Sequence, residues 1–322
     1  MKSQILVKGQ QQVPCLFLMG DSLFDNGNNN LLVTTAKANY PPYGIDYPYG
    51  PTGRFSNGRN IADFLGEFLG FDKPISPFVM AKGLKILKGV NYASGGAGIL
   101  DESGRQQGDR FSLNRQLQNH RTTILRLALL LGSMDQAKEH LRKCLLYTQQ
   151  QFADFLIQKY SQQLRTLYNY EARKIAIFGV GLIGCLPRVL AMYPPTNGST
   201  CVDSINGAVQ LFNNMLKSLV DDLNNDLPNA KFIYINTTGI SSGDPSALGI
   251  KVANASCCIV SRTITKGLCT PGKVPCSNRR EYIFYDDFHP VEIFNQLTAA
   301  RAYNATSLTD SYPIDIRRLV QQ

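Results

Sequence analysis

Short apolar runs recur along the chain and end in glycine or polar residues. They lie at residues 13–19, 89–93, 174–178 and 231–235. Short apolar runs bounded by turn residues are typical of strands that are buried on both faces of a parallel sheet. The pattern therefore predicts four strands at these positions.

Longer segments between these runs carry apolar residues at every third or fourth position. This period predicts helices over residues 60–70, 111–131, 149–170, 204–223 and 291–303. Strands that alternate with helices favour an α/β fold, in which a parallel sheet has helices on both faces.

The first predicted strand ends in Gly-Asp-Ser-Leu at residues 20–23. Ser22 would then lie at the carboxyl edge of the sheet, where open α/β folds bind their ligands. Asp286 and His289 follow an aromatic run and are three residues apart, so that on one helical turn they would share a face. Ser, Asp and His in this chain order are typical of one class of catalytic triad. The alternative for Ser22 is a turn serine that caps the next helix.

The two other histidines and the neighbouring Asp287 are not expected to take part in catalysis. His120 and His140 fall in helical patterns with polar neighbours, which predicts solvated helix faces. Asp287 has the wrong spacing to orient His289 and is expected to cap a helix. A serine hydroxyl needs a base to become a nucleophile, which leaves His289 as the candidate base.

Three further motifs accompany these residues. They are Gly-Pro-Thr-Gly-Arg-Phe-Ser-Asn-Gly-Arg at residues 50–59, Val-Asn-Tyr-Ala-Ser-Gly-Gly-Ala-Gly-Ile at residues 90–99 and Asp-x-x-His-Pro at residues 286–290. With the serine motif, they make the chain resemble the plant GDSL esterase/lipases of the SGNH hydrolase superfamily, from about residue 13 to the end. The resemblance implies a flavodoxin-like, three-layer α/β/α fold.

The resemblance also implies an activity and residue roles. It implies hydrolysis of a carboxylic ester, from a lipid or other acyl ester, through an acyl-enzyme intermediate. Ser22 would be the nucleophile, His289 the base and Asp286 the residue that orients the base. A backbone carbonyl near the histidine can share that role in the superfamily, so losing Asp286 is expected to cost less than losing His289.

The resemblance further implies an oxyanion hole. One N–H donor is expected from Ser22 and another from Gly98, with Gly96 as the alternative. Simple turn geometry is the competing explanation for these glycines. The third donor of the family is an Asn in a Gly-x-Asn-Asp motif that ends a central strand, and this sequence lacks that motif.

The missing motif coincides with a shortened segment. Residues 143–144 run almost directly into residues 146–149, which are interpreted as the start of the next helix. One central strand is therefore expected to be missing. Neighbouring strands would close up, another segment would fill the slot, or the protein would be marginally stable. The alternative function is accordingly an impaired or inactive relative that binds rather than hydrolyses.

Composition narrows the remaining possibilities. The chain has 322 residues, of which 43% are hydrophobic, and residues 13–322 are expected to form a single domain after a non-core segment at 1–12. Its net charge of +9 comes from scattered residues, which argues against a nucleic-acid partner. No apolar run is long enough to span a membrane. A monomer is expected.

The glycine run at 179–184 is interpreted as a structural turn and not as a dinucleotide site, because Cys185 and Pro187 interrupt the helix that such a site needs.

Cysteines and glycosylation sequons indicate the compartment. The eight cysteines form no C-x-x-C pair and only three histidines are present, so a zinc site is not expected. The mechanism that the resemblance implies needs no metal or cofactor. Cys185 and Cys201 are predicted to pair as a loop staple. Asn-x-Ser/Thr sequons occur at Asn197, Asn236, Asn254 and Asn304. These features favour a secreted glycoprotein. Residues 1–12 hold no signal-peptide core, so a clipped or altered N-terminus is expected, with a cytosolic form as the alternative.

Overall fold

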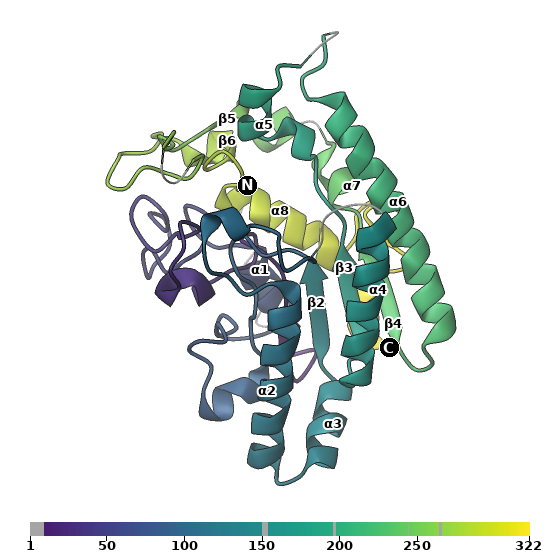
Figure 1. The fold of residues 1–322 in the computed structure, drawn as a ribbon. Coiled ribbons are helices and arrows are strands. Elements are labelled where there is room, and N and C mark those ends of the chain that lie inside the picture. The colour runs from purple at the N-terminus through teal and green to yellow at the C-terminus, as the bar shows by residue number, and fades with distance from the viewer. Residues whose placement is uncertain (1–9, 150–153, 196–197, 244, 264–265) are drawn as a thin grey trace.

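A five-stranded sheet forms the centre of the computed structural model, which describes residues 10–149, 154–195, 198–243, 245–263 and 266–322 (Figure 1). The strands are β1 (Leu16–Leu18), β2 (Leu145–Gln149), β3 (Lys174–Phe178), β4 (Lys231–Ile235) and β7 (Ser311–Tyr312). Their order is β1-β2-β3-β4-β7. The first four are parallel, and β7 pairs antiparallel with β4 at the edge.

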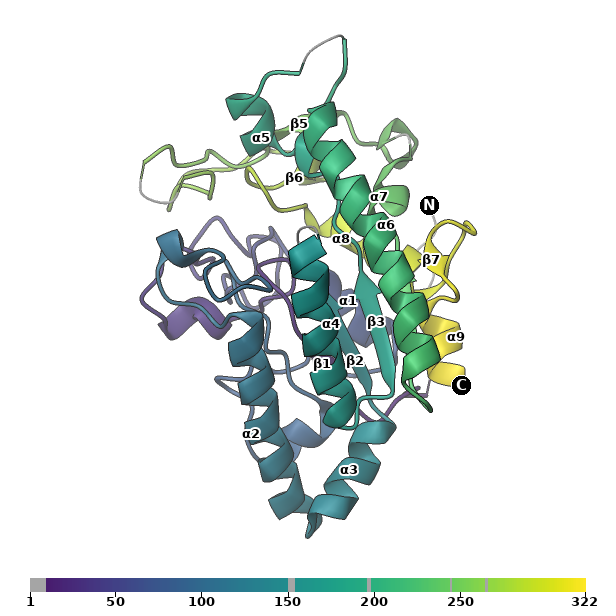
Figure 2. The ribbon, with the colours of Figure 1, turned by 45° about the vertical axis from the view of Figure 1, so that its right-hand side comes forward.

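Helices cover both faces of the sheet (Figure 2). One layer holds α2 (Leu113–Leu131), α4 (Asp154–Asn169) and α6 (Asp203–Asp226), and the other holds α1 (Ile61–Phe68), α8 (Glu292–Tyr303) and α9 (Ile316–Gln321). Neighbouring strand residues alternate between the two layers: Phe17 packs into the first core, and Leu16 and Leu18 pack into the second. The three-layer α/β/α architecture expected from the sequence is therefore confirmed.

The remaining elements lie around this framework. Helix α3 (Met134–Arg142) pairs with α2, and α5 (Pro187–Met192) and α7 (Thr237–Ser241) are short. A separate sheet of β5 (Val252–Ser256) and β6 (Tyr282–Phe284) sits beyond the carboxyl ends of the main strands, at the top of Figure 1. This small sheet carries the chain into Asp286 and His289.

Strand β2 overturns the expectation of a missing central strand. Residues 145–149 pair with β1 on one side and β3 on the other, so that Leu145 stands opposite both Leu16 and Lys174. The prediction that this segment begins a helix is wrong, and α4 begins at Asp154 instead. Leu145 and Leu146 are each only 2% exposed. Without this segment, the facing backbone groups of β1 and β3 would be unpaired inside the core, which explains why it is a strand.

Most of the other predicted strands and helices are present in the structure. Strands β3 and β4 occupy the predicted residues. Helix α1 begins after Asn60, whose side chain forms a capping box with Asp63. Residues 89–93 are a partial exception: they hydrogen-bond to β1 through Val90 and Tyr92, yet only Asn91 forms an isolated bridge. No helix in the described part of the chain is long and apolar enough to cross a membrane.

All eight cysteines form disulfides. The predicted Cys185–Cys201 pair is confirmed. Cys257–Cys276 and Cys258–Cys269 close the loop between β5 and β6. Cys15–Cys144 joins the residues that precede β1 and β2, across a sequence separation of 129. These bonds restrict the unfolded chain, and two of them cross-link the long segment between β5 and β6.

Gly89 is the position where a side chain is least compatible with this fold. Its φ is +108°, and an added Cβ would lie 1.9 Å from the Leu16 carbonyl oxygen of β1. We expect Gly89→Ala to lower the free energy of unfolding by about 3 kcal/mol or more, because backbone strain and a backbone clash add. Urea denaturation measures the loss.

Gly66 supplies the matched control. It lies inside α1, and an added Cβ meets nothing within 4 Å. Gly66→Ala should stabilise the protein by about 0.5–1 kcal/mol through helix propensity. Equal effects of the two substitutions would contradict the close approach of Gly89 to β1.

Candidate active site

Ser22 lies just beyond the carboxyl end of β1 on a backbone that is fixed from two sides. The Gln116 side chain of α2 accepts from the Gly20 N–H and donates to the Gly20 carbonyl, both at 2.9 Å. The Asp21 carboxylate accepts from the Leu23 N–H at 2.9 Å. The Ser22 hydroxyl therefore projects from a rigid turn into the space above the sheet.

Asp286 and His289 reach Ser22 from the opposite end of the chain. Ser22 Oγ lies 2.7 Å from His289 Nε2, and His289 Nδ1 lies 2.8 Å from both Asp286 oxygens. The Phe55 ring packs on the imidazole, with ring centroids 4.8 Å apart. The three residues singled out from the sequence are thus brought together. Asp286 and His289 lie in a bend after β6 instead of on a helical turn.

The glycine turn at residues 94–98 lies beside Ser22 and is held to the serine loop. Asp25 accepts from the Gly95 N–H at 2.9 Å and from the Gly27 N–H at 2.8 Å. Asn29 donates to the Gly95 carbonyl at 2.8 Å. Burial raises the pKa of Asp25 to about 6, although these N–H donors favour the carboxylate. The turn and the serine loop therefore form one packed unit.

The geometry distinguishes Gly96 from Gly98. Both residues follow Gly95, but Gly96 lines the pocket that contains Ser22 and His289, whereas Gly98 does not. The Cα of Gly98 faces the Ser103 side chain, which an added Cβ would meet at 2.5 Å. Within the described residues, the N–H groups of Ser22, Gly96 and Gly98 donate no hydrogen bond to the protein. The position of Gly96 in the pocket is therefore the observation that favours it over Gly98.

A pocket of about 1490 Å³ opens above Ser22. Its wall beyond β3 is formed by the glycine run, which leads through Leu182 and Ile183 into a 3₁₀ turn at Ile183–Cys185. The pocket is also lined by Phe284, Phe288 and Phe294. The family's Gly-x-Asn-Asp motif would follow β2, and residues 150–153 at that point lie outside the described residues. The pocket thus has an apolar part beside the catalytic candidates, and polar and charged residues such as Gln107, Arg188 and Lys251 line the rest.

Two histidines differ from their predicted surroundings. His120 is only 1% exposed and lies against Phe17, with its Nδ1 3.1 Å from the Tyr92 hydroxyl. His140 is half-buried, and its Nε2 lies 3.1 Å from the Leu87 carbonyl oxygen. The prediction of solvated faces is wrong, because α2 and α3 turn these positions toward the core.

His120 gives the protein a pH-dependent stability. Burial lowers its pKa from 6.5 to about 3, so the folded state keeps it neutral while the unfolded chain takes up a proton below pH 6.5. Its contribution to stability is therefore present above pH 6.5 and is lost as the pH falls toward 3. As the pH is lowered from 6.5 to about 3, the free energy of unfolding of the wild type should fall by about 1.4 kcal/mol per pH unit relative to that of His120→Asn. Denaturation curves at several pH values test this, and parallel pH dependences would contradict it.

Asp287 is not the helix cap that the sequence suggested. Helix α8 begins at Glu292 with Val291 at its N-cap. Asp287 instead accepts from the Ser256 hydroxyl at 2.7 Å and pairs with Arg262 at 3.2 Å. Its side chain therefore bonds to Ser256 of β5 and to Arg262.

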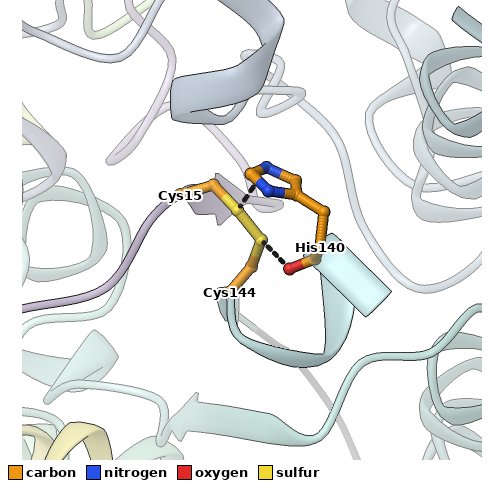
Figure 3. Close-up of side chains that lie close together, drawn as sticks. All are labelled: Cys15, His140 and Cys144. Atoms are coloured by element: carbon orange, nitrogen blue, oxygen red, sulfur yellow. Dashed lines mark hydrogen bonds between the residues drawn. A yellow bond between two sulfur atoms is a disulfide. The ribbon is translucent and has the colours of Figure 1, made fainter. Parts of the chain in front are cut away.

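Cys15, His140 and Cys144 form the one group in the described residues whose His, Cys, Asp or Glu atoms are close enough to share a metal ion (Figure 3). His140 Nε2 lies 3.2 Å from Cys15 Sγ. The two sulfur atoms are joined in a disulfide. Metals bind cysteine as the thiolate, so this group does not fit a metal while the disulfide is intact.

Serine hydrolases as a class share one arrangement, in which a Ser, a His and an Asp are hydrogen-bonded in this order. The site has this arrangement at the carboxyl edge of the parallel strands. Comparison with known proteins agrees. Residues 16–302 match the model of the GDSL-like lipase/acylhydrolase family. The GDSL esterase/lipase At1g29670 of Arabidopsis thaliana is 46% identical, over 99% of this chain and 94% of the relative. At1g29660 of the same plant is 45% identical, over 98% and 93%.

The chain therefore belongs to the GDSL-like lipase/acylhydrolase family and is a carboxylic ester hydrolase. The alignment with At1g29670 extends over 346 positions, more than the 322 residues of this chain. That relative consequently has residues without a counterpart here. A shortening of this chain relative to At1g29670 agrees with that difference in length.

Proposed function

We propose that this chain hydrolyses acyl esters through a covalent intermediate on Ser22. The observation that carries the proposal is the 2.7 Å contact between Ser22 Oγ and His289 Nε2, with Asp286 against the other ring nitrogen. Membership of an acylhydrolase family supports it.

The reaction would follow from this geometry. His289 Nε2 takes the hydroxyl proton as Ser22 Oγ attacks the ester carbonyl, and Asp286 stabilises the imidazolium that forms. His289 then returns the proton to the departing alcohol, which leaves an acyl group on Ser22. Water attacks this ester, with His289 as the base again, and the carboxylic acid is released as the serine hydroxyl is restored.

The oxyanion would be held by the N–H groups of Ser22 and Gly96. The expectation from the family motif favoured Gly98, and the position of Gly96 in the pocket makes it the better candidate. A third donor from a Gly-x-Asn-Asp motif is absent from the sequence. Loss of one such donor lowers kcat by about 10²–10³-fold, so we propose a functional but slow enzyme.

The substrate would be a small-molecule or lipid ester. Part of the pocket has an apolar lining suited to an acyl chain, which is formed by Leu182, Ile183 and four phenylalanines. The test is hydrolysis of p-nitrophenyl acetate, butyrate, octanoate and palmitate by the purified protein, together with covalent labelling by a fluorophosphonate. Turnover and labelling at Ser22 would support the proposal, and a preference for medium or long chains would support the acyl pocket.

The shortened segment favours a second candidate, an impaired relative that binds esters without turning them over. Folded protein that binds a fatty-acid probe but shows neither labelling nor turnover would establish this alternative. Unfolded protein, judged by circular dichroism, would show that the shortening removes stability rather than catalysis.

We propose further that residues 13–322 form a single domain of a secreted, monomeric glycoprotein that degrades lipid esters. The four disulfides and the exposed sequon residues Asn254 and Asn304 support secretion. Asn236 is different, because its side chain caps α7 and donates to the Thr309 carbonyl at 2.9 Å. Asn197 and the segment before residue 10 lie outside the described residues.

Glycopeptide mass spectrometry of protein from plant secretory cells tests the sequons. We expect glycans at Asn254 and Asn304 and little or none at Asn236, because a glycan there would strain the α7 cap. Unmodified Asn254 and Asn304 in secreted protein would contradict the proposal. Size-exclusion chromatography tests the monomer.

A further inference from the structure

The orienting carboxylate of the triad has a partner outside the triad. Asp286 is fully buried, and its Oδ1 accepts from the N–H groups of Phe288 and His289, each at 2.8 Å. Its Oδ2 accepts from the Tyr43 hydroxyl at 2.6 Å. A buried carboxylate needs each of its oxygens satisfied. Among the described residues, Tyr43 is the one side-chain donor to Asp286 besides His289.

The Tyr43 hydroxyl is itself aimed by a second contact. The Cys269 N–H donates to the Tyr43 oxygen at 3.1 Å, which leaves the phenolic hydrogen for Asp286. Tyr43 is only 1% exposed. Its burial and the charge of Asp286 raise the pKa of Tyr43 well above its usual value, so that the hydroxyl remains a donor over the working pH range.

Packing holds the ring in this position. Tyr43 stacks edge-on against Phe55 and Tyr285, with ring centroids 6.0 and 5.8 Å apart, and Phe55 in turn packs on His289. Cys269 is fixed by its disulfide to Cys258. The hydroxyl therefore has little freedom to leave Asp286.

From this arrangement we propose that Tyr43 is a positioning residue of the hydrolytic reaction: its hydroxyl holds the Asp286 carboxylate against His289 Nδ1, which directs His289 Nε2 at Ser22. The inference rests on the proposed function of the triad. Without the Tyr43 hydroxyl, Oδ2 would lose a fixed donor, and the carboxylate could rotate away from the plane of the imidazole. Chemistry would then slow while the substrate pocket stayed intact.

Tyr43→Phe tests this directly, because it removes the hydroxyl and keeps the ring. We expect kcat for a p-nitrophenyl ester to fall about tenfold and KM to stay within twofold, since the hydroxyl donates to a charged group that acts on the chemical step and does not line the substrate pocket. Tyr285→Phe is the matched control. Its hydroxyl is also buried in this cluster but donates to the Pro42 carbonyl, away from the triad. It should lose similar stability and keep its kcat.

A double-mutant cycle separates positioning from general support of the fold. In an Asp286→Ala background, measured against Ser22→Ala as the blank, Tyr43→Phe should change kcat by less than twofold, because its partner is gone. An unchanged kcat in Tyr43→Phe alone, or a tenfold loss that persists in the Asp286→Ala background, would overturn the proposal.

If the proposed hydrolysis at Ser22 is wrong, the experiments give a different result. In that case the wild type itself shows no turnover and no fluorophosphonate label at Ser22, and the role of Tyr43 falls with it. Active, labelled wild type with an unaffected Tyr43→Phe variant rejects the role of Tyr43 alone. If Tyr43→Phe is destabilised, melting curves of Tyr43→Phe and Tyr285→Phe identify a temperature at which both variants are folded. Their kcat values are then compared at that temperature.

Discussion

Ser22→Ala is expected to lower kcat for ester hydrolysis by about 10⁴–10⁶-fold while leaving the protein folded. The nucleophile is lost, and only the oxyanion donors and substrate binding would remain to accelerate attack by water. The fold should persist because His289 is the one hydrogen-bond partner of the Ser22 hydroxyl among the described residues, and Ser22 is only half-buried. Initial rates with p-nitrophenyl esters, with circular dichroism of both proteins, measure the effect.

Ser133→Ala provides a control for this substitution. Ser133 caps α3, far from the pocket in sequence and structure, and its loss should cost about 1 kcal/mol of stability without changing kcat. Retention of activity in Ser22→Ala would remove Ser22 as the nucleophile. Loss of activity in both variants would point to instability instead.

Asp286→Asn should lower kcat by about 10⁴-fold. An amide NH₂ can face His289 Nδ1 where the carboxylate did, which favours the tautomer that presents a hydrogen and not a lone pair to Ser22. The amide also stabilises no imidazolium. The measurement is kcat over a range of pH, and a loss of less than tenfold would mean that a backbone carbonyl takes over the orienting role.

The neighbouring Asp287 provides a matched control for Asp286→Asn. Asp287 is equally buried, at 2% exposed, yet it pairs with Ser256 and Arg262. Asp287→Asn should change kcat by no more than about threefold, because the lost ion pair is partly exposed. Similar losses in the two variants would show that burial of any charge at this bend, and not contact with His289, governs activity.

The triad was accessible from the sequence because each member belongs to a local pattern. Ser22 ends an apolar run, and Asp286 and His289 have a fixed spacing after a strand. The choice between Gly96 and Gly98 was not accessible, since both belong to one glycine turn whose path depends on Asp25 and Asn29. Tyr43 lies in an irregular, Pro- and Gly-rich stretch with no period, so no sequence signal connects it with a residue more than two hundred positions away.

Strand β2 and His120 were mispredicted for different physical reasons. The run at residues 145–149 is short, and the polar residues after it blend into the period of α4, so its pairing with two neighbouring strands decides its structure. His120 did carry a signal. It lies three residues after Leu117 and four before Ile124, on the apolar stripe of α2, and its polar neighbours obscured that position.

The order of the triad along the chain has a consequence for biosynthesis. Ser22 and His289 are 267 residues apart, and His289 follows β6 of the small sheet. The proposed nucleophile and the proposed base therefore meet only after both of these segments have been synthesised and folded. A fragment that lacks either segment cannot carry out the proposed reaction.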